Sequence, residues 1–310
     1  MIRDLKRSDA DRVFEFLSKY FPEEEAILGT RPDGFEKVMR RVFRADTRFI
    51  LGLLRLFGRP VFRFFVVEEG GQVVATTLLS FPERAGFLSM VVVDPAFRRR
   101  GFARSLLERS RRTAQALGKR YVALDVLANN TPARTLYEQV GYRPLQENQI
   151  MVREANAELT GVRSPAVRPY RASDARALVD VARRTQSAEA QQVLPIREAL
   201  FRPGGFANRI LESESAAWVI DRGRGAEGYL QASSSHLITA AHFSTPFVAE
   251  GVEGPEAASL VRTAIEWCIA RHTPRIVSMV PAPNARGRAA LLGGGFHDAL
   301  STWTLYRPVA

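Results

Sequence analysis

Short apolar runs alternate with amphipathic stretches along the first half of the chain. Two runs rich in β-branched and aromatic residues flank Gly70-Gly71, which predicts two strands joined by a tight hairpin turn. Later apolar runs of strand length alternate with stretches whose apolar residues recur at helical spacing. The predicted strands are 63–69, 72–80, 86–93, 121–127 and 143–153, and the predicted helices are 101–117 and 131–140, with a further helical stretch near 33–57. This order predicts an α/β fold (an α+β mixed sheet), in which an antiparallel hairpin leads into a parallel crossover with helices on the faces of the sheet.

The second half of the chain repeats the pattern of the first. Residues 103–130 align with residues 257–284 without a gap at a constant offset of 154. Near the N-terminus, Arg3 and Ser8-Asp9-Ala10 align with Arg168 and Ser173-Asp174-Ala175 at an offset of 165, so the second copy has about eleven residues fewer between its first helix and its hairpin. Such self-similarity predicts two copies of one unit in tandem.

The length of the chain agrees with this duplication, because 310 residues suffice for two domains of ordinary size. Small and polar residues with Gly161 and Pro165 form a stretch that is typical of a linker. We therefore predict one domain over residues 1–155 and a second over residues 165–310.

Composition gives no sign of a nucleic-acid or membrane partner. The net charge is +11, but 40 of the 44 basic residues are arginines spread along the whole chain, and no nucleic-acid-binding motif accompanies them. No run reaches the roughly 18 apolar residues of a membrane-spanning helix, and the N-terminus mixes both charge signs where a signal peptide needs an apolar core. We therefore expect a cytoplasmic protein. A single cysteine, Cys268, and four scattered histidines predict neither a disulfide nor a metal site.

A basic turn stands between the strand at 86–93 and the helix at 101–117. Gly101 allows the chain to approach a ligand closely, and the small Ala103 lets the helix pack on the strand. A strand, a tight turn and a helix start aim backbone N–H groups at a phosphate. The dinucleotide and ATP-binding glycine motifs are absent. Taken alone, the pattern equally describes an exposed basic turn that begins an amphipathic helix.

Two motifs at the proper separation resemble the GCN5-related N-acetyltransferase (GNAT) superfamily. They are VDPAFRRRGFA at 93–103 and ANNTPARTLYEQVGYRPL at 128–145. The resemblance covers the first half well and the second half through the repeat. It implies two tandem GNAT-like acyl-CoA N-acyltransferase domains that use acetyl-CoA as a co-substrate, without a metal.

The resemblance also implies roles for individual residues. The strand segment Val91, Val92 and Val93 would offer backbone groups to the pantetheine arm, which binds like an added strand. Asn130 would hydrogen-bond the same arm, and Tyr137 would lie beside the thioester sulfur and protonate the departing thiolate. The pyrophosphate would bind the basic turn, which consists of Arg98, Arg99, Arg100, Gly101, Phe102, Ala103 and Arg104.

The amine nucleophile must lose a proton, so a general base is expected. Asp125 occupies the place at which family members that acetylate ribosomal protein N-termini carry a glutamate, although aspartate is one methylene shorter. Glu83, at the bend before the strand at 86–93, is a second candidate. A solvated carboxylate is the alternative for both.

The second copy has lost the residues to which chemistry is assigned. At the offset of 154, Gly101 corresponds to Pro255 and Tyr137 to Leu291, while Arg98 becomes Val252. Proline removes an N–H donor, and Glu253 and Glu256 bring negative charge where a pyrophosphate would bind. We therefore expect a degenerate second domain that packs on the first and walls its substrate cleft.

These observations predict an acetyl-CoA-dependent N-acetyltransferase that transfers an acetyl group to a primary amine, of a small molecule or a peptide N-terminus, by direct attack in a ternary complex. The alternative is a non-catalytic acyl-CoA-binding sensor or interaction module. Three carboxylates, Glu23-Glu24-Glu25, would suit a cationic acceptor, but they equally suit a solvated helix start. The sequence is compatible with an intramolecular domain pair as a monomer or a homodimer.

Overall fold

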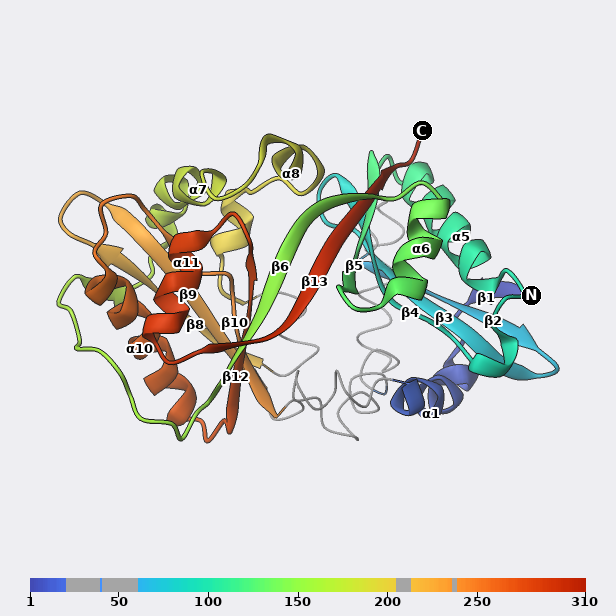
Figure 1. Ribbon diagram of the computed structural model, residues 1–310, viewed down its shortest axis with the longest axis horizontal. Coiled ribbons are helices and arrows are strands. Elements are labelled where there is room, and N and C mark those ends of the chain that lie inside the picture. Colours follow the sequence, from blue (N-terminus) through green and yellow to red (C-terminus); the bar gives the residue numbers. More distant parts are fainter. Residues whose placement is uncertain (21–39, 41–60, 205–212, 236–238) are drawn as a thin grey trace.

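The strands of both halves join one continuous mixed sheet in the computed structural model (Figure 1). The structure describes residues 1–20, 40, 61–204, 213–235 and 239–310. The helical stretch expected near 33–57 and the acidic cluster Glu23-Glu24-Glu25 lie outside the described residues. The strand order is β1-β2-β3-β4-β5-β13-β6-β12-β10-β9-β8-β7, with β11 paired to β9.

The first half contains the elements that the apolar periodicity predicts, with shifts of one or two residues at their ends. Its strands are β1 (Ile2–Asp4), β2 (Phe62–Glu69), β3 (Gln72–Ser80), β4 (Ala85–Val93), β5 (Tyr121–Leu127) and β6 (Arg143–Glu154). Its helices are η1 (Arg7–Asp9), α1 (Ala10–Tyr20), η2 (Pro95–Phe97), α5 (Phe102–Ala116) and α6 (Thr131–Gln139). The predicted α/β fold class is confirmed.

The second half repeats this order. Its strands are β7 (Val167–Pro169), β8 (Ser213–Asp221), β9 (Ala226–Ser235), β10 (Ala240–Phe243), β11 (Phe247–Val248), β12 (Arg275–Pro281) and β13 (His297–Pro308). Its helices are η3 (Ala172–Asp174), α7 (Ala175–Arg183), α8 (Ala188–Val193), η4 (Glu198–Phe201), α10 (Gly254–Ile269) and α11 (Ala285–Gly293).

The two copies share an ion-pair network at their N-termini, as the sequence echo suggests. Arg3 binds Asp9 and Glu68, and Arg168 binds Asp174 and Asp221 in the same way. In each copy the buried aspartate also accepts the N–H of the residue three positions earlier, which fastens the turn that precedes the first long helix. These arginines hold the pKa of each aspartate below its ordinary value.

The halves exchange their last strands. β6 leaves the first half and pairs with β12 of the second, while β13 of the second half pairs with β5 of the first. The two exchanged strands also pair with each other, so that they form the centre of the sheet (Figure 1). The registers agree with a pseudo-twofold arrangement: Asp125 pairs with Thr304, and Met279, its counterpart at the offset of 154, pairs with Ile150. Asn148 and Thr302, which are each other's counterparts, pair at the centre.

Each exchanged strand supplies core residues to the other half. Leu305 and Val309 are buried in the first-half core, among residues such as Leu88 and Leu106, whereas Met151 is buried in the second-half core beneath α10. Arg153 of β6 is 1 % exposed and donates to the Gly294 carbonyl at the end of α11 and to backbone carbonyls of the linker. The sequence predicts two adjacent domains but not this exchange, because strand pairing between copies leaves no mark in the apolar pattern.

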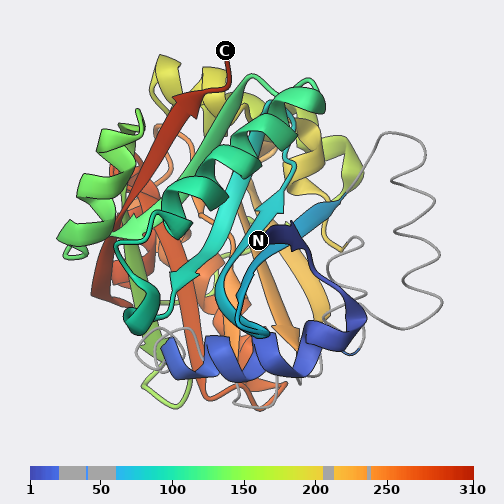
Figure 2. The same cartoon turned by 90° about the vertical axis from the view of Figure 1, so that its right-hand side faces the viewer.

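Different helices cover the two faces of the first-half strands. α5 packs on the face that carries Phe65, Leu88 and Leu124 and crosses it in Figure 2, and α1 packs on the opposite face against Phe64 and Val66. The opposite face is also covered from the second half: Val193 and Leu194 of the α8 region pack with Ala123 of β5 and Tyr306 of β13. The second half therefore contributes to the face of the first half that α5 does not cover.

We expect Leu305→Ala and Met151→Ala each to destabilise the half opposite to the one that encodes the residue. Each truncation removes a fully buried side chain, which costs about 2–5 kcal/mol of unfolding free energy. Hydrogen exchange measured by mass spectrometry should show faster exchange in β3 to β5 for Leu305→Ala and in β9 to β12 for Met151→Ala. Faster exchange confined to the half that encodes each residue would contradict the exchanged topology.

Candidate functional site

The parallel strands β4 and β5 separate halfway along their length. Their pairing runs from Ala85–Tyr121 to Leu88–Leu124, although β4 continues to Val93 and β5 to Leu127. A bulge at Met90, which has a φ of 55°, shifts the register of β4 against β3 at this point. Because the strands part here, the backbone of Val91, Val92 and Val93 borders a slot into which an extended ligand can insert as an added strand.

Threonine side chains hold the bulge in place. The hydroxyl of Thr76 donates to the Met90 carbonyl and that of Thr77 to the Ser89 carbonyl, both at 3.2 Å. Both threonines are completely buried. The slot is therefore built into the sheet and requires no ligand to form it.

The basic turn after β4 presents a run of unpaired backbone N–H groups. Asp94 accepts the N–H of Ala96 at 2.8 Å and caps the short helix η2. Arg99 (φ 61°) and Gly101 (φ 82°) both adopt left-handed conformations, and α5 then begins at Phe102. Within the described chain, no hydrogen bond takes up the backbone N–H groups of residues 99–104. A turn of this shape ahead of a helix N-terminus is an anion-binding concavity.

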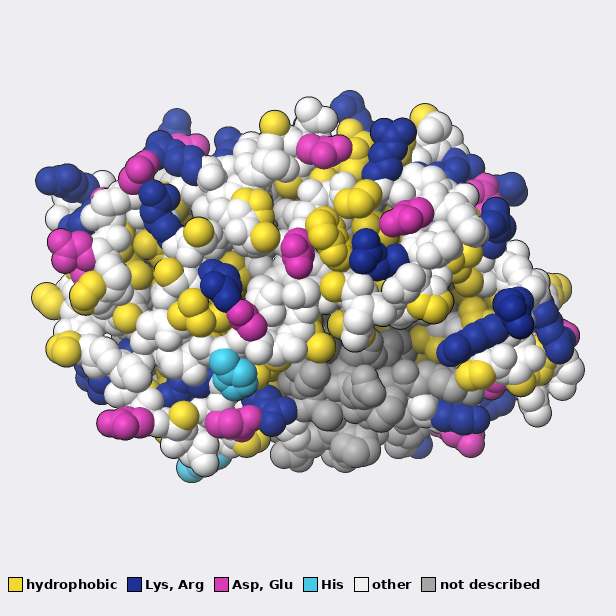
Figure 3. All heavy atoms as spheres, in the orientation of Figure 1, with side chains coloured by type: hydrophobic (Ala, Val, Ile, Leu, Met, Phe, Trp, Pro, Cys, Tyr) yellow, Lys and Arg dark blue, Asp and Glu magenta, His cyan; other side chains and the backbone are white. Residues whose placement is uncertain are grey.

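The arginine side chains of the turn divide into two groups. Arg98 donates to the Val93 carbonyl at 3.2 Å, and Arg100 pairs with Glu69 at 3.1 Å and lies over the Phe97 ring, so both fix the turn. Arg99 and Arg104 are exposed and, among the described residues, form no ion pair. Figure 3 shows basic side chains gathered at this end of the first half, where β4 ends and α5 begins. Positive charge thus remains available for a diphosphate.

Asn130 begins α6 as its N-cap. Its Oδ1 accepts the Ala133 N–H at 3.2 Å, and the residue is exposed. The side-chain NH2 group and the second lone pair of Oδ1 remain available for the predicted hydrogen bond to the cofactor arm.

Tyr137 lies on α6 and is 6 % exposed. Its ring contacts the Tyr142 ring, with 5.8 Å between centroids. Burial raises the pKa of Tyr137 to about 12. The phenol therefore remains protonated at neutral pH and can act as a proton donor.

The structure separates the two candidate bases. Asp125 lies on the face of β5 opposite to α5, where Thr304 Oγ1 donates to its Oδ1 at 2.6 Å. Burial raises the pKa of Asp125, and the hydrogen bond from Thr304 opposes this shift. Glu83 instead lies at the surface, in an ion pair with Arg197 at 3.0 Å. Asp125 is thus the enclosed carboxylate of the two.

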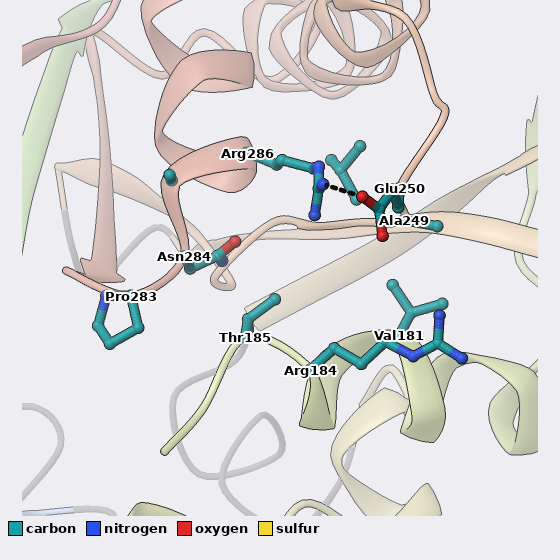
Figure 4. A pocket seen from close by; sticks show the side chains of 10 residues that line it. Val181, Arg184, Thr185, Ala249, Glu250, Pro283, Asn284 and Arg286 are labelled. Atoms are coloured by element: carbon teal, nitrogen blue, oxygen red, sulfur yellow. Dashed lines mark ion pairs between the residues drawn. The ribbon is translucent and has the colours of Figure 1, made fainter.

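In the second half, side-chain hydrogen bonds bridge the corresponding slot. Asn284, the counterpart of Asn130, is buried and donates to the Pro246 carbonyl at 2.7 Å. Thr245 donates to the Met279 carbonyl at 2.8 Å, across the gap where β10 and β11 part from β12. A cavity of about 420 Å³ remains between α7, β11 and α11, and an ion pair of Arg286 with Glu250 at 3.3 Å crosses it (Figure 4).

The start of α10 is also unsuited to phosphate. Glu253 is its N-cap residue, Pro255 and Glu256 follow in its first turn, and Glu256 lies 3.6 Å from Arg222. The carboxylates of Glu253 and Glu256 thus offset the partial positive charge at the start of α10.

Among the described residues, no group of three or more histidine, cysteine, aspartate or glutamate side chains could hold a metal ion. The described helices include none that combines the length and apolar character needed to cross a membrane. Cys268 is buried in the second half, and burial raises the pKa of its thiol to about 12.

The first half thus places a separating pair of parallel strands ahead of an amide-lined turn at a helix start. The Acetyltransferase (GNAT) family model matches residues 12–142. The whole chain also superposes on a tandem GNAT protein from the clavulanic acid biosynthesis pathway, with a TM-score of 0.65, 15 % identity and coverage of 100 % of this chain and 98 % of that one. A GCN5-related N-acetyltransferase from Sphaerobacter thermophilus has the same TM-score and identity and is covered to 95 %. Residues 12–142 thus match the GNAT family of acetyltransferases, and the chain as a whole has the fold of the tandem GNAT protein.

Three residues that the sequence did not indicate form a hydrogen-bonded row with Asp125. Thr304 contacts Asp125 although 179 positions separate them, and Asn148 and Gln146 continue the same hydrogen-bonded chain. The signal in the sequence is that Gln146 and Asn148 are polar on a strand face that continues with the apolar Ile150 and Val152, but only the strand exchange connects them with Asp125.

We expect Gly101→Ala to weaken coenzyme A binding at least tenfold, because a side chain at a φ of 82° is strained and the turn must change shape. Isothermal titration calorimetry measures the affinity. Gly251→Ala is the matched control: Gly251 also has a φ of 82° with open space around it, but it lies in the second half. Equal losses of affinity for the two variants would disprove the role of this turn.

Proposed function

We propose that the protein is an acetyl-CoA-dependent N-acetyltransferase that acetylates a primary amine of a small molecule or a peptide N-terminus. The observation that carries the proposal is the coincidence of the slot, the amide-lined turn, Tyr137 and Asp125 in one half of the chain. In the other half, the corresponding slot is bridged by hydrogen bonds and the corresponding helix start is acidic. Leu291 stands in the place of Tyr137, and Met279 in the place of Asp125. The catalytic unit is residues 1–155, completed by β13, and residues 165–310 form the degenerate partner.

Binding of the co-substrate follows from the backbone geometry. The diphosphate takes the free N–H groups of residues 99–104 and the charge of Arg99 and Arg104. The pantetheine arm takes the open edge of Val91–Val93, which directs the thioester into the slot between β4 and β5.

The chemical step needs one proton donor and one proton acceptor. The amine nitrogen attacks the thioester carbonyl carbon, a C–N bond forms and the C–S bond breaks. Tyr137 gives its phenolic proton to the departing sulfur, and Asp125 takes the proton that the nitrogen loses. The amine attacks the bound thioester directly, so no acyl-enzyme forms; Cys268, with its buried, protonated thiol, lies in the other half.

We expect Tyr137→Phe to lower kcat at least a hundredfold while the dissociation constant of coenzyme A stays unchanged, because the ring remains and only the proton donor is lost. Stopped-assay thiol release measures kcat, and calorimetry measures binding. Tyr142→Phe is the control, since the buried Tyr142 hydroxyl has no hydrogen-bond partner among the described residues and its counterpart is Phe296. The proposal fails if both variants lose the same activity.

The rate should rise with pH as Asp125 ionises, because the base acts only as carboxylate. Burial raises the pKa of Asp125, so this rise should lie above the ordinary range of an aspartate. Tyr137, with a pKa of about 12, should produce no alkaline fall below about pH 11. A pH profile of kcat/KM for wild type and Asp125→Asn checks this, and a rise of unchanged midpoint in Asp125→Asn would exclude Asp125 as the base.

The decisive test of function is thiol release from acetyl-CoA in the presence of a panel of primary amines. Turnover that Tyr137→Phe and Asp125→Asn abolish supports the enzyme. Coenzyme A binding without turnover across the panel would favour the alternative, an acyl-CoA-binding sensor.

A further inference from the structure

Three polar side chains form a row across the exchanged strands. Asp125 on β5 pairs with Thr304 on β13, and Thr304 pairs with Gln146 on β6. Cross-strand partners project from the same face of a sheet, so the three side chains share the face that α5 does not cover. Asn148, two residues beyond Gln146, lies on the same face.

The hydrogen bonds of this row have a defined direction. Gln146 Nε2 donates to Asn148 Oδ1 at 3.0 Å, and Asn148 Nδ2 donates to Thr304 Oγ1 at 2.8 Å. Because the Thr304 oxygen accepts from Asn148, its proton is directed toward Asp125 Oδ1, 2.6 Å away. All three hydrogen bonds of the row thus point from donor to acceptor in the direction of Asp125. This direction stabilises the charged, carboxylate form of Asp125.

The row is not required by the fold. Its counterpart in the second half is Met279 on β12, Ile150 on β6 and Leu300 on β13, which pair in the same registers. The same sheet position is thus built from apolar residues where the slot is bridged. The polar version also carries a cost, because Gln146 Oε1 is buried without a hydrogen-bond partner in the described part of the chain.

We propose that Thr304, supplied by the second half and held by Asn148 and Gln146, is a positioning residue that fixes Asp125 as the acceptor of the amine proton. The assignment rests on the proposed function for the identity of the reaction. It makes the degenerate half part of the active site: the strand that completes the first-half core also orients its base.

Few other groups act on Asp125. Among the described residues, the titratable or charged side chains on this face around the row are Tyr121 of β5, Tyr306 of β13, Glu189 of α8 and Arg143 of β6. Tyr306 is hydrogen-bonded to Glu189 and is the cross-strand partner of Arg143. Among the described residues, no charged side chain contributes to the pKa of Asp125. Removal of the Thr304 hydroxyl therefore isolates one interaction.

The test compares Thr304→Val, Thr304→Ser and Thr302→Val in the full-length protein. Thr302 is the matched control, because it is a buried threonine on the same strand and face that reaches Asn148 at 3.5 Å but not Asp125. Carbon-13 NMR of aspartate carboxyls, with the Asp125 signal assigned by its loss in Asp125→Asn, reports the ionisation of Asp125 without any substrate. The isosteric Val at this row is compatible with folding, since Ile150 occupies the equivalent place.

We expect Thr304→Val to raise the midpoint of Asp125 ionisation by about one pH unit, because a hydrogen bond to the charged form is lost. The acid limb of kcat/KM should move upward by the same amount, Thr304→Ser should restore both, and Thr302→Val should move neither. An unchanged Asp125 midpoint in Thr304→Val, or an equal shift in Thr302→Val, would overturn the positioning role.

The NMR and activity measurements separate the two hypotheses. A shifted Asp125 midpoint in a protein that turns over no amine upholds the contact and refutes the proposed acetyl transfer. An active enzyme whose Asp125 midpoint and acid limb are the same in wild type and Thr304→Val refutes the positioning role and leaves the proposed function standing.

Discussion

The pairing of β13 with β5 is the interaction on which the rest of the structure depends. It closes the first half of the sheet, buries Leu305 and Val309 in a core that another part of the sequence builds, and brings Thr304 to Asp125. The equivalent pairing of β6 with β12 does the same for the second half. Because each half lacks its own last strand, neither has a complete sheet without the other. An unpaired strand edge would otherwise expose backbone groups to solvent and to other chains.

The two halves differ clearly in the turn that precedes their long helix. Both turns precede a long helix that packs on the same face of its strands. In the first half, Arg99 and Gly101 adopt left-handed conformations just before the helix. In the second half, Pro255 lacks an N–H, and Glu253 and Glu256 place negative charge at the helix start. The region where the strands part also differs, since hydrogen bonds of the Thr245 and Asn284 side chains bridge it in the second half.

Much of the fold could be predicted from sequence, because it depends on local periodicity and on the internal repeat. The bounds of β3 and β5 agree with the predicted ones, and the paired Arg3 and Arg168 networks follow from the echo between the N-termini. The candidate cofactor residues came from motifs within one strand–turn–helix unit. The exchange of β6 and β13 could not be predicted, because two copies of the same pattern allow each last strand to pair with either partner. The contact of Thr304 with Asp125, and the other surroundings of Asp125, therefore could not be predicted from the sequence.

The strand exchange has a consequence for how such a chain can evolve. The second copy of a duplicated domain is usually free to accumulate change, yet here its last strand completes the sheet of the first half and contacts Asp125. Insertion of a single residue into β13 ahead of Thr304 would move Thr304 and Leu305 each to the other face of the sheet. Thr304 would then lose its contact with Asp125, and Leu305 would leave the first-half core. The two copies accordingly differ by about eleven residues between the first helix and the hairpin, while the stretch from 103 to 154 keeps an unbroken offset to 257–308. The difference in length between the copies thus lies outside the stretch that contains the exchanged strands.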